Sequence, residues 1–319
     1  MTRSWLRARE FSTVAILAAE VLFFAWYLAP ESGPHTFWNA TNFLLILKYS
    51  AIYGIPAIGA AIVIISGGID VSPGAVIALT TVVIGYLFVP AGWPLWASAL
   101  AGLLVGVAAG LTSSWLIVRV GLPPFIATLG VMGVWRGTAL IITQGRFFDL
   151  SAKLPRNWEV AGVSIDWLGP IVMVALAALF QFLMTGYQWG RSVFAVGGNE
   201  TAALFSGIPV SRVKTTAYVI AGLLASVSGV VLATVQGQGK ADLAGGYELD
   251  IIASAVVGGA SLAGGRGSVA GAVLGALIFG VLRNGLTQIP GATFYERLLV
   301  GVAVIVIVVM DQVLTRRER

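Results

Sequence analysis

The stretch GRSVFAVGGNETAALFSGIPVSRVK, residues 190–214, is a polar, glycine-punctuated interval between two long apolar runs. It opens with Arg191 and closes with Arg212 and Lys214, and residues 200–205 at its centre favour helix. Apolar runs of this length belong in lipid, whereas a polar interval does not. We therefore expect a short helix at a membrane surface, accessible to another protein.

The composition places the rest of the chain in a membrane. Of its 319 residues, 58% are hydrophobic and 10% are charged, and the chain has no cysteine. A soluble domain carries roughly 25% charged residues, so lipid must be the solvent here. The length has room for about eight to ten crossings at ~20 residues each. We expect one all-α integral membrane domain over residues 1–319, without disulfides or thiolate metal sites.

Ten apolar runs predict ten transmembrane helices. They lie at residues 11–29, 43–65, 72–89, 94–118, 124–143, 167–185, 215–235, 249–262, 268–289 and 294–313. The first run contains Glu20 and lacks a small-x-small cleavage site before Pro30, which favours a retained span over a signal peptide. The small-residue ladders Gly102/Gly106/Gly110 and Gly267/Gly271/Gly275 predict close helix contacts.

The basic residues predict the orientation of the chain. Ten crossings put both termini on one side, and most basic residues fall on that side: Arg3, Arg7, Arg9, Arg119, Arg191, Arg212, Lys214, Arg266 and the C-terminal arginines. Because basic residues concentrate in cytoplasmic loops, both termini and a loop over residues 186–214 are expected in the cytoplasm. Residues 144–166 are expected to form a periplasmic loop. The net charge of +5 reflects this bias and does not indicate a nucleic-acid surface.

Two motifs interrupt the apolar pattern, SGGIDVSPG at residues 66–74 and GGRGS at residues 264–268. Non-helical backbone at membrane depth requires cover from protein or a water-filled path, so two interrupted or half-length helices are expected. The pattern G-G-x5-G-A-V begins within both motifs and spans Gly67–Val76 and Gly264–Val273. This match favours an internal duplication or is a coincidence in a chain rich in Gly, Ala and Val.

Asp70 is a candidate for the solute pathway, because carboxylates within apolar segments are commonly functional. Ser72 would then be the N-cap of the next helix, with Pro73 at its first position. In a structural interpretation, Asp70 and Ser72 only satisfy the free amides of a buried helix start.

Several polar residues lie near the ends of later runs. Arg136 and Asn284 are candidates to contact a hydroxylated solute, although an arginine there also snorkels to the interface. Trp135 either stacks on a sugar ring or is an ordinary interfacial tryptophan. Glu248 and Asp250 begin the eighth run, where they either complement the helix dipole or contact a partner protein.

The sequence contains no catalytic or metal-binding constellation. Its single histidine, His35, lies in a Ser-Gly-Pro-His loop, and the phosphate-binding pattern G-x-x-x-x-G-K-[ST] is absent. No cofactor is expected. If ATP drives this protein, another chain binds it.

The motifs together resemble the permease subunits of bacterial ABC importers for ribose, xylose and similar sugars, a branch that includes autoinducer-2 and rhamnose permeases. The segments that carry the resemblance are residues 66–74, PPFIATLG at 123–130, 190–200 with Ser206–Ile208, GYELD at 246–250 and 256–268. They cover nearly the whole chain in the family's order. Pro73 departs from the family pattern but suits a first helical turn.

The resemblance implies a set of partners in the bacterial inner membrane. A second permease subunit would complete the pathway, two cytoplasmic ATPase subunits would dock on the chain, and a periplasmic binding protein would deliver the sugar. The residues implied in ATPase coupling are Arg191, Gly198, Asn199, Glu200, Ala203, Ser206 and Gly207. The residues expected along the pathway are Ser66, Asp70, Ser72, Phe125, Thr128, Arg136 and Asn284, with Glu248 and Asp250 toward the binding protein.

Three other classes of membrane protein make different demands on the sequence. An ion-coupled secondary transporter requires an essential buried carboxylate, for which Asp70 is the best candidate. A membrane enzyme requires a catalytic cluster, and a membrane scaffold does not explain two interrupted helices. The sequence leaves open which sugar is carried and whether the second permease is a copy of this chain.

Overall fold

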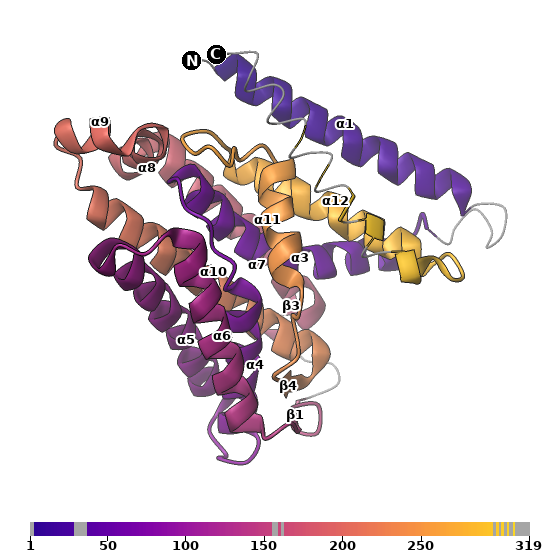
Figure 1. Ribbon diagram of the computed structural model, residues 1–319. Helices are drawn as coiled ribbons and strands as arrows, with labels where there is room; N and C mark the ends of the chain where they lie inside the picture. Colours follow the sequence, from indigo (N-terminus) through magenta and orange to yellow (C-terminus); the bar gives the residue numbers. More distant parts are fainter. Residues whose placement is uncertain are drawn as a thin grey trace.

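The computed structural model describes residues 3–28, 37–154, 159–160, 163–295 and isolated positions between 298 and 309. Within them the chain is a helical bundle (Figure 1). Each of the first nine apolar runs forms a helix: α1 (Arg3–Tyr27), α3 (Ala40–Ile65), α4 (Pro73–Phe88), α5 (Leu95–Trp115), α6 (Pro124–Thr143), α7 (Ile165–Gly186), α10 (Val210–Gln236), α11 (Tyr247–Val257) and α12 (Val269–Thr287). His35, most of the tenth run and the C-terminal arginines lie outside the described residues.

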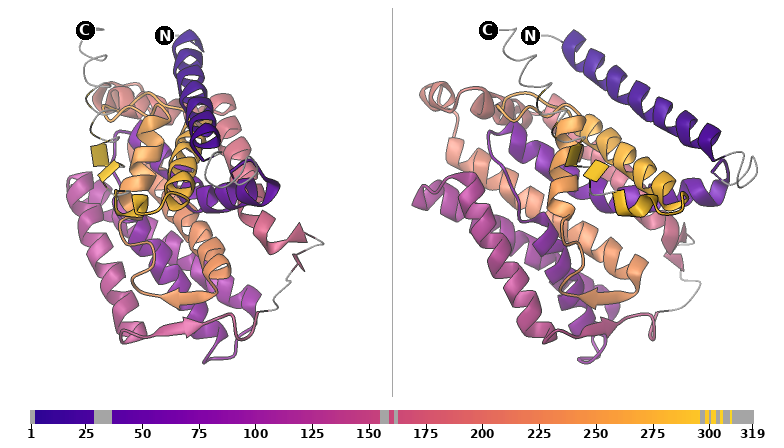
Figure 2. Two further views of the ribbon diagram at one scale, coloured as in Figure 1. Left: turned by 90° about the vertical axis from the view of Figure 1, so that its right-hand side faces the viewer. Right: turned by 45° about the vertical axis from the view of Figure 1, so that its right-hand side comes forward.

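Six of these helices are long and apolar enough to cross a membrane, namely α3, α5 with its continuation to Val120, α6, α7, α10 and α12. The chain is therefore a multi-pass membrane protein. The N-terminal end of α1 lies at the same end of the bundle as the surface helices α8 (Gln188–Gly198) and α9 (Glu200–Phe205) (Figures 1 and 2). The count of ten crossings and the side on which the termini lie stay predictions.

Helices α4 and α11 are half-length, in agreement with the two interruptions. They have 16 and 11 residues, or ~24 and ~16 Å, against ~30 Å of hydrocarbon. Their N-terminal ends meet inside the bundle. A β-carbon on Gly74 would lie 2.3 Å from Glu248 Oε2 and 2.7 Å from the Ala244 carbonyl oxygen. Two broken helices thus begin at one place in the interior.

The two halves of the bundle are related by reciprocal packing. Helix α4 packs on α5 and α10, whereas α11 packs on α12 and α3. Helix α3 ends at the end of the bundle where α10 begins, so the two run in opposite directions (Figure 1). This is the pattern of inverted repeats in transporters. The G-G-x5-G-A-V match pairs the start of α4 with the start of α12, and the duplication that it suggests stays a prediction.

Glycines bring the helices of the core together. A β-carbon on Gly106 would lie 2.2 Å from the Gly222 carbonyl oxygen, and one on Gly275 would lie 2.1 Å from the Ser254 carbonyl oxygen. These contacts join α5 to α10 and α12 to α11. Both predicted ladders are therefore confirmed as close helix contacts. In lipid, where the hydrophobic effect does not drive helices together, such packing stabilises their association.

The end of the bundle opposite α8 and α9 carries two small sheets. β1 (Phe147–Asp149) pairs antiparallel with β4 (Gln238–Lys240), and β2 (Glu159–Val160) pairs with β3 (Val163–Ser164). They belong to the predicted 144–166 loop and to the segment after α10. The expectation of helices alone missed these short strands.

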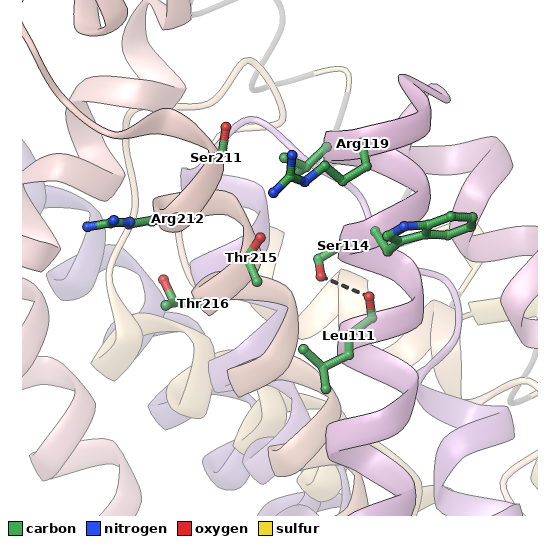
Figure 3. Close-up of a pocket in the computed structure, with 9 residues that line it drawn as sticks. Leu111, Ser114, Arg119, Ser211, Arg212, Thr215 and Thr216 are labelled. Atoms are coloured by element: carbon green, nitrogen blue, oxygen red, sulfur yellow. Dashed lines mark hydrogen bonds between the residues drawn. The ribbon is translucent and has the colours of Figure 1, made fainter.

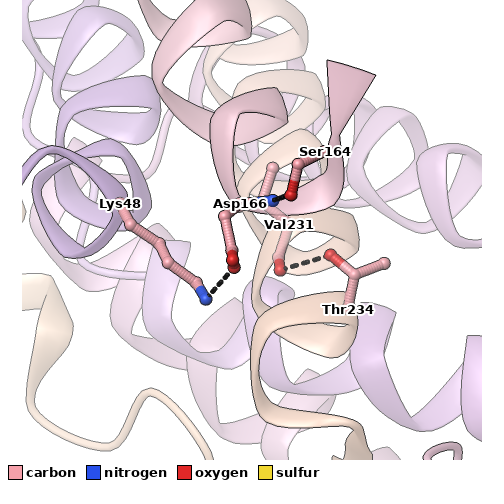
Figure 4. A network of polar contacts seen from close by, with 5 residues as sticks. All are labelled: Lys48, Ser164, Asp166, Val231 and Thr234. Carbon is pink, nitrogen blue, oxygen red and sulfur yellow. Dashed lines mark hydrogen bonds and ion pairs between the residues drawn. The ribbon is translucent and has the colours of Figure 1, made fainter. Parts of the chain in front are cut away.

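An ion pair closes the loop onto the bundle. Lys48 of α3 pairs with Asp166 in the first turn of α7 (Figure 4). The Ser164 hydroxyl caps α7 by accepting from the Asp166 amide at 3.4 Å. The loop is thereby tied to two of the membrane-length helices.

Candidate coupling surface and solute pathway

The predicted surface helix at residues 200–205 is present as α9. Asn199 connects α8 to α9 and is the N-cap of α9, where its side chain accepts a hydrogen bond from the Ala202 amide at 2.9 Å. Glu200 pairs with Lys214 at 2.6 Å and so ties α9 to α10. Gly207 follows the helix with φ +80°, a left-handed conformation that glycine adopts without strain.

The side chains of α9 divide into an inner and an outer set. Ala203 is buried against the bundle, whereas the other six residues expected in coupling are exposed: Arg191, Gly198, Asn199, Glu200, Ser206 and Gly207. Leu204 and Phe205 are 60% and 86% exposed. These two residues were not predicted as contact residues, although large apolar residues in a polar interval indicate a protein contact.

Backbone contacts join α8 to the end of α3. A β-carbon on Gly197 would lie 1.7 Å from the Ile65 carbonyl oxygen and 2.7 Å from the Gly265 nitrogen. The Gly265 amide in turn donates to the Ile65 carbonyl at 2.9 Å. A β-carbon on Gly264 would lie 2.5 Å from the Gly197 carbonyl oxygen and 3.2 Å from Gly67 Cα.

We call this contact the glycine junction, formed by Gly67, Gly197, Gly198, Gly264 and Gly265. It joins the segment before α9 to both interruptions, with backbone against backbone. The sequence indicates these positions only by three glycine pairs, at 67–68, 197–198 and 264–265. Their meeting point was not predicted.

Four of the seven pathway residues gather at the first interruption: Ser66, Asp70, Ser72 and Thr128. Asp70 Oδ1 accepts from the Ser72 amide at 2.8 Å and from its hydroxyl at 2.7 Å. Thr128 Oγ1 accepts from the Val71 amide at 3.3 Å. Ser72 stands at the N-cap position of α4 and Pro73 at the first helical position, as expected, but the Ser72 side chain makes no cap bond to α4. The geometry favours the structural interpretation of Asp70.

Arg136 turns inward from α6. Its Nη1 atom donates to the carbonyls of Ala241 and Leu243 at 2.7 and 2.8 Å, and so holds the segment that precedes α11. Trp135 packs against the bundle core, and its Nε1 atom is buried without a hydrogen-bond partner in the structure. In this structure Arg136 therefore does not extend to the membrane interface, and Trp135 packs inside the bundle and is not an interfacial tryptophan.

Phe125 and Asn284 lie away from the other pathway residues. Phe125 is 48% exposed on α6. Asn284 donates to Asn42 Oδ1 at 2.8 Å and accepts from Gln288 at 2.9 Å, in a polar cluster between α3 and α12. The seven residues therefore occupy several places and do not line one path within this chain.

Asp250 is not at the surface. It is 4% exposed and pairs with Arg283 Nη2 at 2.7 Å. The Arg283 guanidinium lies over the Tyr53 ring at 4.5 Å, and the ring centroids of Tyr53 and Tyr247 are 4.6 Å apart. Since this cluster is internal, the structure corrects the expectation that Asp250 faces a binding protein. Glu248, in the first turn of α11, is half-buried beside Gly74 of α4, and its Oε2 atom has no hydrogen-bond partner in the structure.

Six membrane-length helices, two half-length helices that begin at one interior point, and a surface helix joined to both interruptions define a membrane transport protein. Residues 42–309 match the family described as branched-chain amino acid transport system / permease component. The chain belongs to this family of permease components, and it is a transport subunit of an ABC importer rather than an enzyme.

Three relatives illustrate the similarity. The probable ABC transporter permease protein YphD of Escherichia coli K12 is 36% identical over 98% of this chain and 92% of its own length. The ribose import permease protein RbsC of Bacillus subtilis 168 is 36% identical over 87% of this chain and 86% of its own. The xylose transport system permease protein XylH of E. coli K12 is 31% identical over 98% and 94%. No solved structure gives a significant match.

Proposed function

We propose that this chain carries a sugar or sugar-like solute across the bacterial inner membrane, using ATP hydrolysed on separate subunits. The names of RbsC and XylH support a sugar, and both proteins align with most of this chain. The family description names branched-chain amino acids instead. A pentose-type solute is favoured because ribose and xylose, which these relatives' names give, are both pentoses.

The observation that carries the coupling proposal is the exposed tip of α9. Leu204 and Phe205 project from a helix that is fixed by the Asn199 cap and the Glu200–Lys214 pair. A rigid helix with an apolar tip suits a groove on an ATPase subunit. Arg191, Gly198, Ser206 and Gly207 would form the rim of that contact, and buried Ala203 would hold the helix to the bundle.

The glycine junction supplies a route for the movement. ATP can bias the bundle only if the ATPase binds its two states unequally. A shift of α8 then acts on the end of α3 and on the segment before α12, because no side chain separates the Gly197 backbone from Ile65 and Gly265. Helices α4 and α11, which follow and precede these points, would tilt and alter the interior where they meet.

The meeting point of α4 and α11 is the proposed place of solute passage. Sugar hydroxyls need donors and acceptors, and Trp135 Nε1 and Glu248 Oε2 are buried atoms without partners in the described structure. Asp70, Ser66, Ser72, Thr128 and Arg136 would shape this place by holding backbone. Phe125, on the exposed face of α6, would contact the second permease subunit, and Asn284 would hold α12 to α3.

The contact with a periplasmic binding protein is better proposed at the β1–β4 end. Lys240 and Asp242 there form an exposed pair at 2.8 Å. Lys153, in the loop that follows β1, donates from its Nζ to the Val89 carbonyl at 2.9 Å. Glu248 and Asp250 lie deeper. Charges on an exposed rim suit a transient protein contact.

Uptake by proteoliposomes tests this function. They would contain the permease, its cognate ATPase and its binding protein, with ribose, xylose and leucine offered separately. We expect uptake of a sugar that needs ATP and persists when the membrane potential is dissipated. Uptake driven by an ion gradient without ATP, or uptake of leucine alone, would contradict the proposal.

A further inference from the structure

A groove separates the end of α5 from the first turns of α10, close to the start of α9. It has a volume of about 450 Å³ and is lined by Leu111, Ser114, Trp115, Val118, Arg119, Ser211, Arg212, Thr215 and Thr216 (Figure 3). We propose that this groove binds the headgroup of an anionic phospholipid from the leaflet on the α8–α9 side.

The rim of the groove is basic and hydroxylated. Arg119 reaches across the groove toward Ser211 and Thr215, whereas Arg212 projects from the other side of α10 (Figure 3). Both arginines are exposed, and within the described residues neither forms an ion pair with this chain. The Arg119 guanidinium, uncompensated and beside two hydroxyl donors, suits a phosphate.

The backbone places Arg119 at the end of the helix that continues α5. The residue lies in the π-helix η1 (Leu116–Val120), which continues α5 and ends at Gly121 with φ +82°. Such π turns are frequent at functional sites. Arg119 therefore stands where a membrane-length helix leaves the bilayer, at the level of lipid headgroups.

The floor of the groove distinguishes a lipid from a soluble anion. Leu111 and Trp115 line the groove and are 50% and 58% exposed, and Leu104, outside the groove and two turns further along α5, is 66% exposed. Their spacing places them on one face of α5, below Arg119. An acyl chain can lie along this apolar face while its phosphate meets the rim, whereas free phosphate gains nothing from it.

Binding of phosphatidylglycerol to the full-length protein, measured by native mass spectrometry, tests the proposal. Phosphatidylcholine and inorganic phosphate serve as comparison probes. The Arg119→Gln variant should lose about fivefold in affinity, since a basic residue near an anionic headgroup contributes roughly fivefold. Arg146→Gln removes the same charge from an exposed site at the other end and should bind as the parent does.

A further variant tests the apolar part of the groove, and three results would contradict lipid binding. Trp115→Ala should weaken binding of the long-chain lipid, because it shortens the apolar floor. Equal binding of phosphatidylcholine, unchanged affinity in the Arg119→Gln variant, or competition by inorganic phosphate at concentrations equal to those of lipid would overturn the proposal. An Arg119→Gln variant that alters self-association but not lipid binding would assign the groove to a second copy. The assay uses neither ATPase nor sugar, so its result is independent of the transport function.

Discussion

The Gly265 amide donates a hydrogen bond to the Ile65 carbonyl at 2.9 Å. This bond joins the end of α3 to the segment before α12, two regions that the sequence marks only as interruptions. Gly197 of α8 packs directly against both partners. The segment that carries α9 is therefore connected to both broken regions of the bundle at one point.

Gly197→Ala should uncouple the surface helix from the bundle. The new β-carbon would lie 1.7 Å from the Ile65 carbonyl oxygen. The backbone shift that removes this overlap costs ~1–3 kcal/mol of unfolding free energy. We expect ATP-driven uptake to fall about tenfold, equivalent to ~1.4 kcal/mol, while the ATPase still co-purifies. The measurement is uptake by proteoliposomes alongside pull-down of the ATPase.

Gly130→Ala is the matched control, because nothing lies within 4 Å of a β-carbon at that helical position. It should fold and transport normally. If Gly197→Ala also transports normally, the glycine junction does not pass movement to the interruptions.

Asp70 distinguishes ATP-driven from ion-coupled transport. Asp70→Asn keeps the oxygen that accepts from the Ser72 amide and hydroxyl, so uptake and thermal stability should stay close to the parent values. Asp70→Ala leaves those donors unpaired and should cost ~1–3 kcal/mol of unfolding free energy. Loss of uptake in a stably folded Asp70→Asn protein would support the ion-coupled alternative instead.

The Asp250–Arg283 pair should behave as a buried ion pair. Removal of one partner, in Asp250→Asn or Arg283→Gln, should cost ~3–5 kcal/mol, because an uncompensated charge stays inside. The double variant should cost less than the sum of the single variants. Thermal unfolding in detergent of all three variants gives the coupling energy.

The exposed Glu200–Lys214 pair is the comparison, since surface pairs are worth ~0.2–1 kcal/mol. A coupling energy at Asp250–Arg283 no larger than this surface value would show that the cluster with Tyr53 and Tyr247 does not stabilise the interior.

Local patterns predicted most helices of the fold. Apolar run length predicted ten helices, of which the first nine are described as helices, and the polar interval with its Asn-Glu start predicted α9. The glycine-rich motifs predicted where α4 and α11 are interrupted. These features depend on neighbouring residues, so they can be read along the chain.

Contacts between distant segments could not be predicted in this way. Gly197, Ile65 and Gly265 meet across long sequence separations, and a glycine pair looks alike wherever it packs. Asp250 starts a helix, where an acidic residue suits the dipole on a surface or in the interior, so only Arg283 packed beside it reveals the burial. The same ambiguity hid the exposure of Phe205.

The most direct test of the central claim is site-directed cross-linking of α9 to the ATPase. The chain has no cysteine, so Phe205→Cys and Trp93→Cys each introduce a single thiol, the second at the opposite end of the bundle, where Trp93 is 49% exposed. In the assembled transporter, a short thiol-to-amine cross-linker should join the ATPase to Phe205→Cys and not to Trp93→Cys. Cross-linking through Trp93→Cys alone would contradict the assignment of α8 and α9 as the surface that receives the ATPase.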